Sequence, residues 1–189
     1  MVIAFEGLDG SGKDTQIKLF TNYLESINKP YVVINSCSSW LLSKIIRDKL
    51  KDPNVNKKQL AGLFIAELHE HVDTIKIALN SGKLVILNRW IYSTMAYNST
   101  SVKDIEAICE LSVSDIKVDH IIYLNVDINT AMNRINSRDN VKEVYETPSH
   151  LTEVSGYYEY MKKMFKFEVV DGCKEPQLVA NDIRKFLEF

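Results

Sequence analysis

The stretch Met1-Val-Ile-Ala-Phe-Glu-Gly-Leu-Asp-Gly-Ser-Gly-Lys-Asp-Thr15 decides the fold of this 189-residue chain. Residues 2–5 form an apolar run of the kind that a buried parallel strand requires. The backbone can then turn tightly at three glycines, Gly7, Gly10 and Gly12. Residues 16–27 have the spacing of an amphipathic helix. This order of strand, glycine-rich loop and helix predicts a phosphate-binding loop.

The spacing of Gly7, Gly12 and Lys13 indicates what this loop binds. Successive backbone N–H groups of such a loop converge on an anion at a helix N-terminus, and the lysine reaches the β- and γ-phosphates. The next residue is normally a Ser or Thr that binds Mg²⁺, but here it is Asp14. Because Asp14 is also a hard oxygen ligand and Thr15 follows it, the sequence predicts an altered magnesium site that includes Asp14.

The composition is that of an ordinary globular protein, with 46% hydrophobic and 25% charged residues. The formal net charge of −2 offers a polyanion no attraction, so nucleic acid is not favoured as a partner. The cysteines are too widely spaced for a disulfide framework or a metal cluster: Cys37, Cys109 and Cys173. No apolar run approaches membrane-spanning length, and the N-terminus resembles a strand rather than a signal peptide. We therefore expect a soluble, cytoplasmic protein with no membrane partner.

Predicted strands and helices alternate along the chain. Short apolar runs predict strands at residues 2–5, 31–34, 84–87, 120–126 and 167–170. Helical spacing predicts helices at residues 16–27, 40–50, 57–79, 93–97, 102–111, 129–135, 151–164 and 177–189. Such alternation predicts a doubly wound α/β fold, with a parallel sheet covered by helices on both faces. The length indicates a single domain, residues 1–189.

Arg89 is the second residue on which the functional prediction depends. It follows the predicted strand at residues 84–87, and open α/β sheets bind ligands at the carboxyl ends of their strands. Phosphoryl transfer spreads negative charge over the transferred oxygens, so its catalysis requires positioned positive charge. Lys13 and Arg89 would supply that charge. The alternative for Arg89 is an ordinary surface arginine with its head in water.

Two segments carry a resemblance to a known family. The loop Phe5-Glu-Gly-Leu-Asp-Gly-Ser-Gly-Lys13, with Thr15-Gln16, resembles that of thymidylate kinases, which have an acidic residue two positions after the first glycine. The second segment is similar to the family's Asp-Arg-aromatic motif and its continuation: Asn88-Arg89-Trp90, then Ser93, Ala96, Tyr97 and Asn98. Weaker similarity extends from about residue 2 to residue 185, and the phosphate-binding loop is its most specific part.

The resemblance implies a P-loop nucleoside monophosphate kinase that takes part in nucleotide biosynthesis. Such an enzyme uses Mg²⁺ and transfers the γ-phosphoryl group of ATP to dTMP, giving dTDP. Its partners are small-molecule nucleotides, and the family is dimeric, which implies a homodimer. The implied ATP-binding residues are Gly7, Gly10, Ser11, Gly12, Lys13, Asp14 and Thr15.

The resemblance also implies a lid at about residues 136–148. One form of the family has a catalytic arginine inside the phosphate-binding loop, and the other takes it from the lid. Because this chain has Gly10 in the loop, the second form is implied, with Arg138 as the first candidate and Arg134 as the next. The implied catalytic residues are then Lys13, Arg89, Arg138 and Arg134. For the lid arginines the alternative is a solvated helix end.

The acceptor nucleotide is implied to bind a separate set of residues: Asp9, Arg47, Phe64, Arg89, Ser93, Tyr97, Asn98 and Tyr145. Asp9 would accept a hydrogen bond from the sugar 3′-hydroxyl, and Arg47 would hold the acceptor phosphate. Phe64, Tyr97 and Tyr145 would form aromatic walls around the base. Without the resemblance, the sequence would predict equally well that Phe64 is a core residue and that Arg47 is a solvated charge on a helix.

Several positions depart from the family pattern, among them Asn35, Cys37 and Asn98, and three more bear directly on the chemistry. Leu68 stands where the family has an arginine that reads the base, and Asn88 stands where it has an aspartate. Asp14 replaces the hydroxyl residue, so one carboxylate is missing and another is gained. Without the base-reading arginine the acceptor could be dUMP or a 5-modified deoxypyrimidine nucleotide.

Two further alternatives remain open at the level of sequence. The three departures together allow a nucleotide-binding protein that has lost turnover. A deoxynucleoside kinase would need a carboxylate base near the 5′-hydroxyl, which Asn88 cannot supply but Glu6 could.

Overall fold

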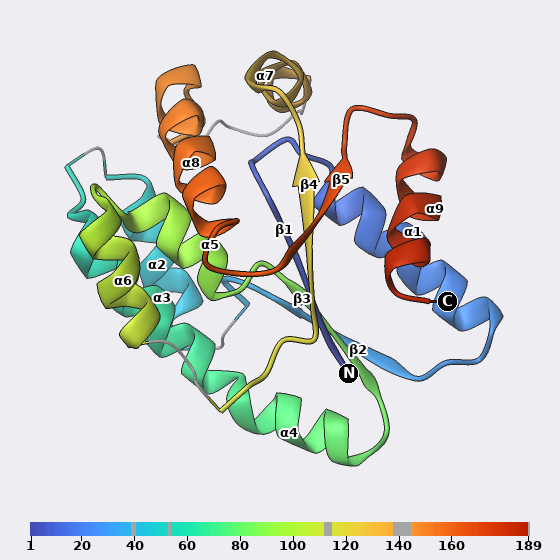
Figure 1. The fold of residues 1–189 in the computed structure, drawn as a ribbon. Helices are drawn as coiled ribbons and strands as arrows, with labels where there is room; N and C mark the ends of the chain where they lie inside the picture. Colours follow the sequence, from blue (N-terminus) through green and yellow to red (C-terminus); the bar gives the residue numbers. More distant parts are fainter. Residues whose placement is uncertain (39–40, 53, 112–114, 138–144, 189) are drawn as a thin grey trace.

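A parallel β-sheet forms the centre of the protein in the computed structural model (Figure 1). The structure describes residues 1–38, 41–52, 54–111, 115–137 and 145–188. Within these residues the sheet has five strands in the order β2-β3-β1-β4-β5. They are β1 (Val2–Gly7), β2 (Tyr31–Asn35), β3 (Leu84–Asn88), β4 (His120–Asn125) and β5 (Phe167–Asp171). The predicted doubly wound α/β fold is confirmed.

The central strand, β1, fixes where ligands can bind. Every residue of β1 is buried, which explains its continuous apolar run, since both faces of a parallel sheet are covered. It pairs with β3, where Ala4 lies opposite Leu87, and with β4, where Phe5 lies opposite Ile122. The loops that follow these three neighbouring strands therefore meet at the carboxyl edge of the sheet.

Helices cover both faces of the sheet (Figure 1). α1 (Lys13–Ser26) and α9 (Pro176–Phe186) lie on one face, where Phe20 and Ile183 belong to the same core cluster as Phe5. The opposite face carries α3 (Lys57–Glu70), α4 (Val72–Asn80), α5 (Ile91–Asn98), α6 (Val102–Glu110) and α8 (Pro148–Met161). α2 (Ser43–Leu50) packs on α3, and α7 (Ile128–Asn136) stands above the carboxyl end of β4. No helix in the described ranges has the length and apolar character needed to cross a membrane.

One predicted element is wrong. The sequence predicts a single helix at residues 57–79, but the structure has two helices, α3 and α4, which meet at His71. There the backbone N–H of His71 donates to the carbonyl of Leu68, three residues back, so the turn is tighter than an α-helical one. The His71 ring also bonds the Glu67 carboxylate at 2.9 Å. The other predicted elements agree with the observed ones to within about a turn.

Gly10 allows α7 to pack against the phosphate-binding loop, residues 7–15. Its φ is +79°, in the left-handed region that favours glycine. A Cβ atom at Gly10 would lie 2.4 Å from the carbonyl oxygen of Ala131 in α7. An arginine at this position of the loop therefore has no room unless α7 moves.

We predict that Gly10→Ala lowers the free energy of unfolding by about 1–3 kcal/mol, because both the backbone and the contact with α7 are strained. Urea unfolding measures this change. Gly156→Ala is the matched control, since Gly156 is an exposed residue inside α8 and no atom lies within 4 Å of an added Cβ. The control should be neutral or more stable by up to about 1 kcal/mol. Equal behaviour of the two variants would contradict the packing argument.

Candidate active site

The phosphate-binding loop borders a cavity of about 390 Å³ at the carboxyl edge of the sheet. We call it the phosphate cavity. Its lining residues are Asp9, Gly10, Gly12, Lys13, Asp14, Thr15, Ser36, Asn88 and Arg89. α1 begins at Lys13, beside this cavity. The free N–H groups and the dipole at a helix N-terminus favour an anion there.

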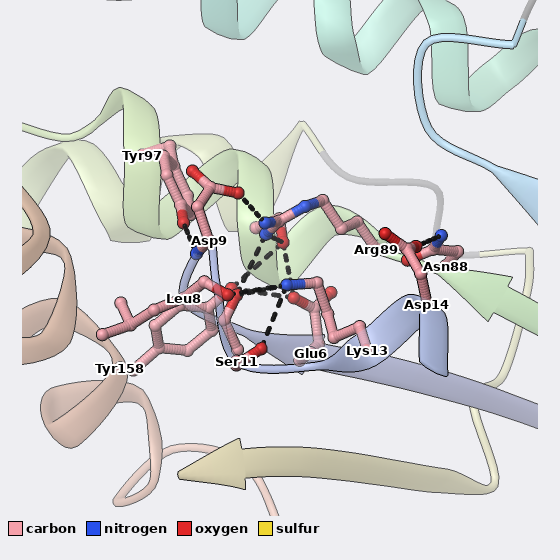
Figure 2. A network of polar contacts seen from close by, with 12 residues as sticks. Glu6, Leu8, Asp9, Ser11, Lys13, Asp14, Asn88, Arg89, Tyr97 and Tyr158 are labelled. Atoms are coloured by element: carbon pink, nitrogen blue, oxygen red, sulfur yellow. Dashed lines mark hydrogen bonds and ion pairs between the residues drawn. The ribbon is translucent and has the colours of Figure 1, made fainter. Parts of the chain in front are cut away.

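Lys13 is buried, and the loop itself holds its ammonium group (Figure 2). Nζ donates to the carbonyls of Gly7 at 3.0 Å and Leu8 at 2.8 Å, and to Ser11 Oγ at 3.2 Å. Burial and the nearby Arg89 charge together lower the pKa of Lys13 to about 7, against the opposing effect of the carboxylates. Because a bound phosphate favours the charged form, phosphate and proton binding are coupled at this lysine.

Arg89 is held rigidly at the end of β3 (Figure 2). Its φ of 68° is uncommon for a residue with a side chain and turns the chain sharply after the strand. Nη1 donates to the Gly7 carbonyl at 3.1 Å and to Ser93 Oγ at 2.9 Å, and Nη2 donates to the Asp9 carboxylate. The guanidinium also lies over the Tyr97 ring, 5.0 Å from its centroid. These contacts fix the position of one positive charge.

A second cavity, of about 250 Å³, adjoins the first. We call it the acceptor cavity. Its lining residues are Asp9, Ser36, Cys37, Leu50, Phe64, Arg89, Ser93, Thr94, Tyr97, Asn98 and Tyr145. Phe64 from α3, Tyr97 from α5 and Tyr145 before α8 give it aromatic walls suited to a flat ring. The two cavities share Asp9, Ser36 and Arg89, so their occupants would meet at these residues.

The structure brings most of the predicted site residues together. Seven of the predicted acceptor-binding residues line the acceptor cavity: Asp9, Phe64, Arg89, Ser93, Tyr97, Asn98 and Tyr145. Arg47 is absent from that lining; its Nη2 donates at 2.7 Å to the carbonyl of Cys37, which does line the cavity. Five predicted ATP-binding residues line the phosphate cavity: Gly10, Gly12, Lys13, Asp14 and Thr15. The other two, Gly7 and Ser11, bind the Lys13 ammonium.

Sequence reasoning missed Ser36, Cys37, Leu50 and Thr94 as lining residues. A signal existed for Ser36 and Cys37, because they lie in a polar stretch after a predicted strand, where α/β sheets bind ligands. Leu50 has the spacing of an ordinary apolar helix residue, and its place depends on how α2 packs. Leu68 is 2% exposed and lies in the core, so it does not replace the lost arginine on the cavity wall.

The predicted lid is only partly described. Arg138 lies outside the described residues, as do all of residues 138–144. Arg134 is in the last turn of α7, and its guanidinium donates to the carbonyls of Gly10 at 3.4 Å, Ser11 at 3.3 Å and Gly172 at 3.0 Å. Arg134 therefore joins the phosphate-binding loop to the segment that follows β5.

Asp14 and Asn88, the two exchanged residues, are in direct contact. Asn88 Nδ2 donates to Asp14 Oδ1 at 2.8 Å and to Asn35 Oδ1 at 3.0 Å (Figure 2 shows the first pair). Among the described residues there is no group of three or more His, Cys, Asp or Glu that could hold a metal ion without help. A cation at Asp14 would complete its coordination with phosphate and water oxygens, as Mg²⁺ commonly does.

The fold and the two adjoining cavities define the class of protein, a kinase with a phosphate-binding loop. Comparison with known proteins gives the family, because the family model described as "Thymidylate kinase" matches residues 5–183. The chain is 35% identical over 190 residues to a probable thymidylate kinase of Methanocaldococcus jannaschii, covering 100% of this chain and 96% of the relative. It is 34% identical over 172 residues to a probable thymidylate kinase of Methanococcus aeolicus, covering 90% of this chain and 83% of the relative. It is 30% identical over 196 residues to a thymidylate kinase of Thermosipho africanus, covering 100% of this chain and 98% of the relative. The chain belongs to the thymidylate kinase family, whose members are nucleoside monophosphate kinases.

His150 packs against two of the aromatic residues that line the acceptor cavity. Its ring centroid lies 4.9 Å from that of Tyr145 and 5.9 Å from that of Tyr97. Burial lowers the pKa of His150 below its usual 6.5, and the Lys57 ammonium lowers it further, while the Glu153 carboxylate opposes the shift. The neutral imidazole is therefore the form that the folded protein favours.

We predict that His150 makes the protein less stable in mild acid. Below about pH 6.5 the unfolded chain binds a proton at this ring that the folded chain resists, so the free energy of unfolding falls as the pH falls. Thermal unfolding at about pH 7.5 and about pH 5.5 measures the effect. His150→Phe keeps an aromatic ring but does not titrate, so its melting temperature should fall less on acidification. Identical pH profiles for parent and variant would contradict the prediction.

Proposed function

We propose that this protein transfers the γ-phosphoryl group of ATP to a deoxynucleoside monophosphate, with dTMP converted to dTDP. The observation that supports this most strongly is the junction of the two cavities. Arg89 and Asp9 line both the phosphate cavity and the acceptor cavity. A donor phosphate held by the loop would therefore meet an acceptor phosphate beside a fixed guanidinium, which is the charge that phosphoryl transfer requires.

Each substrate has a place in this arrangement. The phosphate chain of ATP binds the loop N–H groups and draws the Lys13 ammonium away from its carbonyl partners. The acceptor base lies against Phe64 and Tyr97, and its sugar lies near Asp9. The acceptor phosphate approaches Arg89, with Arg47 behind the wall formed by Cys37. Holding the two phosphates in line and neutralising their charge accounts for most of the catalysis in this class of reaction.

Magnesium fits the donor set at the rim of the phosphate cavity. Asp14 and Thr15 are exposed and carry hard oxygen ligands, and the Asn35 amide oxygen lies nearby through Asn88. We infer that Asp14 would hold Mg²⁺, which neutralises charge on the donor phosphates when bound.

The lid completes the proposed site. A lid excludes water and so prevents hydrolysis of the donor. We propose that residues 136–148 form this lid and that Arg138 supplies the further arginine. Arg134 remains the second candidate. The three carbonyl contacts of Arg134 favour Arg138, because Arg134 would have to leave the loop to reach a phosphate.

Two further proposals concern the surroundings of the protein. We propose a homodimer, supported by large apolar side chains at the surface, such as Ile45 in α2 and Ile77 in α4, which are 46% and 66% exposed. Its mass in solution, measured by light scattering, tests this. We also infer a cytoplasmic location, supported by three free cysteines in a fold that uses no disulfide among its described residues.

The central test is Lys13→Ala. This variant should lose ADP release in a coupled assay with dTMP and dUMP, because it removes the ammonium group that the loop would present to the donor phosphates. Lys18→Ala is the matched control, since Lys18 lies on the same helix and is exposed. Equal turnover by Lys13→Ala and the parent protein would overturn the catalytic role of the loop. A parent protein that binds nucleotide but turns over no acceptor would instead support a binding protein without catalysis.

We predict relaxed choice between pyrimidine acceptors. Leu68 lies in the core and offers the base no hydrogen bond, so the cavity distinguishes dTMP from dUMP mainly by the space around one methyl group. Such a difference is worth about 1–3 kcal/mol in an apolar pocket. The ratio of kcat/KM for dTMP to that for dUMP should therefore stay below about 10³. A larger ratio would mean that a polar residue such as Asn98 reads the base.

We predict energetic coupling between Asp14 and Asn88, because their side chains touch at 2.8 Å. Asp14→Thr alone should weaken Mg²⁺-dependent turnover, since it removes the carboxylate at the rim. Asn88→Asp alone should also weaken it, because two carboxylates would then face each other. The double variant restores the family pattern and should recover much of the loss. Magnesium titrations of all four proteins complete the cycle, and additive effects would show that the two residues are unrelated.

A further inference from the structure

A buried carboxylate stands at an unexpected place in this site. Glu6, at the end of β1, has no exposed surface and lies next to the phosphate-binding loop. A site that binds phosphates gains nothing from a nearby negative charge, which repels them. Burying an ionised group is also costly unless it is well hydrogen bonded. The presence of a buried carboxylate at this position therefore requires a structural explanation.

Glu6 accepts hydrogen bonds on both oxygens. Oε1 accepts from the backbone N–H of Trp90 at 2.7 Å. Oε2 accepts from the hydroxyls of Ser93 at 2.5 Å and Tyr158 at 2.8 Å (Figure 2 shows Tyr158 beside Glu6). Burial raises the pKa of Glu6 above its usual value, and these hydrogen bonds and the Arg89 charge oppose that shift. Three donors satisfy the ionised form.

The direction of these hydrogen bonds connects Glu6 to Arg89. Ser93 has one hydroxyl hydrogen, and it points to Glu6, so the oxygen lone pairs of Ser93 are left for the Arg89 Nη1 donor at 2.9 Å. The second connection runs through the backbone. Trp90, whose N–H binds Glu6, directly follows Arg89, the residue with a φ of 68°. The carboxylate thus contacts both the peptide that follows Arg89 and the hydroxyl group that accepts from its guanidinium.

We propose that Glu6 is the positioning residue for Arg89. As a carboxylate it fixes the peptide after Arg89 and orients the Ser93 hydroxyl, and together these hold the guanidinium at the junction of the two cavities. The inference rests on the proposed function, because it assigns Arg89 to the phosphates that meet there. It also removes Glu6 as the carboxylate base of a deoxynucleoside kinase, since its oxygens are buried and occupied by donors.

Glu6→Gln tests the direction of the hydrogen bonds without changing the shape of the side chain. The amide NH₂ must face either the Trp90 N–H or the two hydroxyls. In the first orientation two donors oppose each other, and in the second the Ser93 hydrogen is turned toward Arg89. We expect kcat to fall by about 10- to 100-fold, with a smaller change in the KM for ATP.

Tyr158→Phe is the matched control. It removes one donor from the same buried carboxylate but leaves the contacts of Glu6 with Ser93 and Trp90 intact. Its kcat should stay within about threefold of the parent value, even where its melting temperature falls as much as that of Glu6→Gln. Equal losses of kcat in the two variants would show that Glu6 acts only on stability, and would overturn the proposal.

A double-mutant cycle with Arg89→Ala separates positioning from general support. If Glu6 acts through Arg89, adding Glu6→Gln to Arg89→Ala should lower kcat by no more than about twofold. A second loss of kcat as large as that of Glu6→Gln in the parent protein would overturn the proposal. Ser93→Ala breaks the same connection at its middle residue, so it replaces Glu6→Gln in this cycle if that variant does not fold.

An NMR measurement on the Arg89 guanidinium tests this inference independently of the proposed function. The Arg89 Nε–Hε signal in ¹⁵N-labelled protein is assigned by its loss in Arg89→Ala. It should shift or broaden in Glu6→Gln and in Ser93→Ala, and remain in place in Tyr158→Phe. An unchanged signal in Glu6→Gln would overturn the positioning role even in an active enzyme. Absence of turnover in the parent protein would overturn the proposed function and leave this measurement decisive for Glu6.

Discussion

Lys13, which is buried, and Arg89, which is partly buried, lie close together at the carboxyl edge of the sheet, and the remaining polar groups of the site compensate the repulsion between their positive charges. Arg89 lowers the pKa of Lys13, as burial does. Three oxygen atoms of the loop accept from the ammonium, and the Asp9 carboxylate accepts from the guanidinium. Incoming phosphates can take over these contacts. The protein thus keeps a phosphate site ordered before its substrate arrives.

The phosphate-binding loop could be predicted from the sequence because its geometry is local. Its glycines and its lysine lie within residues 7–13, and the strand and helix that flank it adjoin them in the sequence, so their physical roles depend on little else. The three central strands, β1, β3 and β4, could be predicted for a similar reason, since burial on both faces produces continuous apolar runs. Arg89 could be placed at the ligand edge because it directly follows one of them.

Other features depend on contacts between distant segments, and the sequence does not reveal those contacts. The break at His71 lies inside a continuous helical pattern, where spacing alone predicts one helix. Leu50 has the pattern of an ordinary apolar residue, yet it borders the acceptor cavity because α2 packs on α3. The acidic residue Glu6 gives no sign that its partners lie more than eighty residues away in the chain. Gly10 is required by Ala131, which the loop motif does not contain.

The register of the parallel sheet creates these distant contacts. Phe5 of β1 lies opposite Asn88 of β3, and the Arg89 N–H donates to the Phe5 carbonyl at 3.1 Å. The next residue of β1, Glu6, is therefore beside the turn that carries Arg89. In the same way Asn35 of β2 lies opposite Asn88, which brings their amides together at the rim. A slip of one residue would reverse the faces on which these side chains lie. The apolar pattern that fixes the register for burial thus also assembles the charged site at the end of the strands.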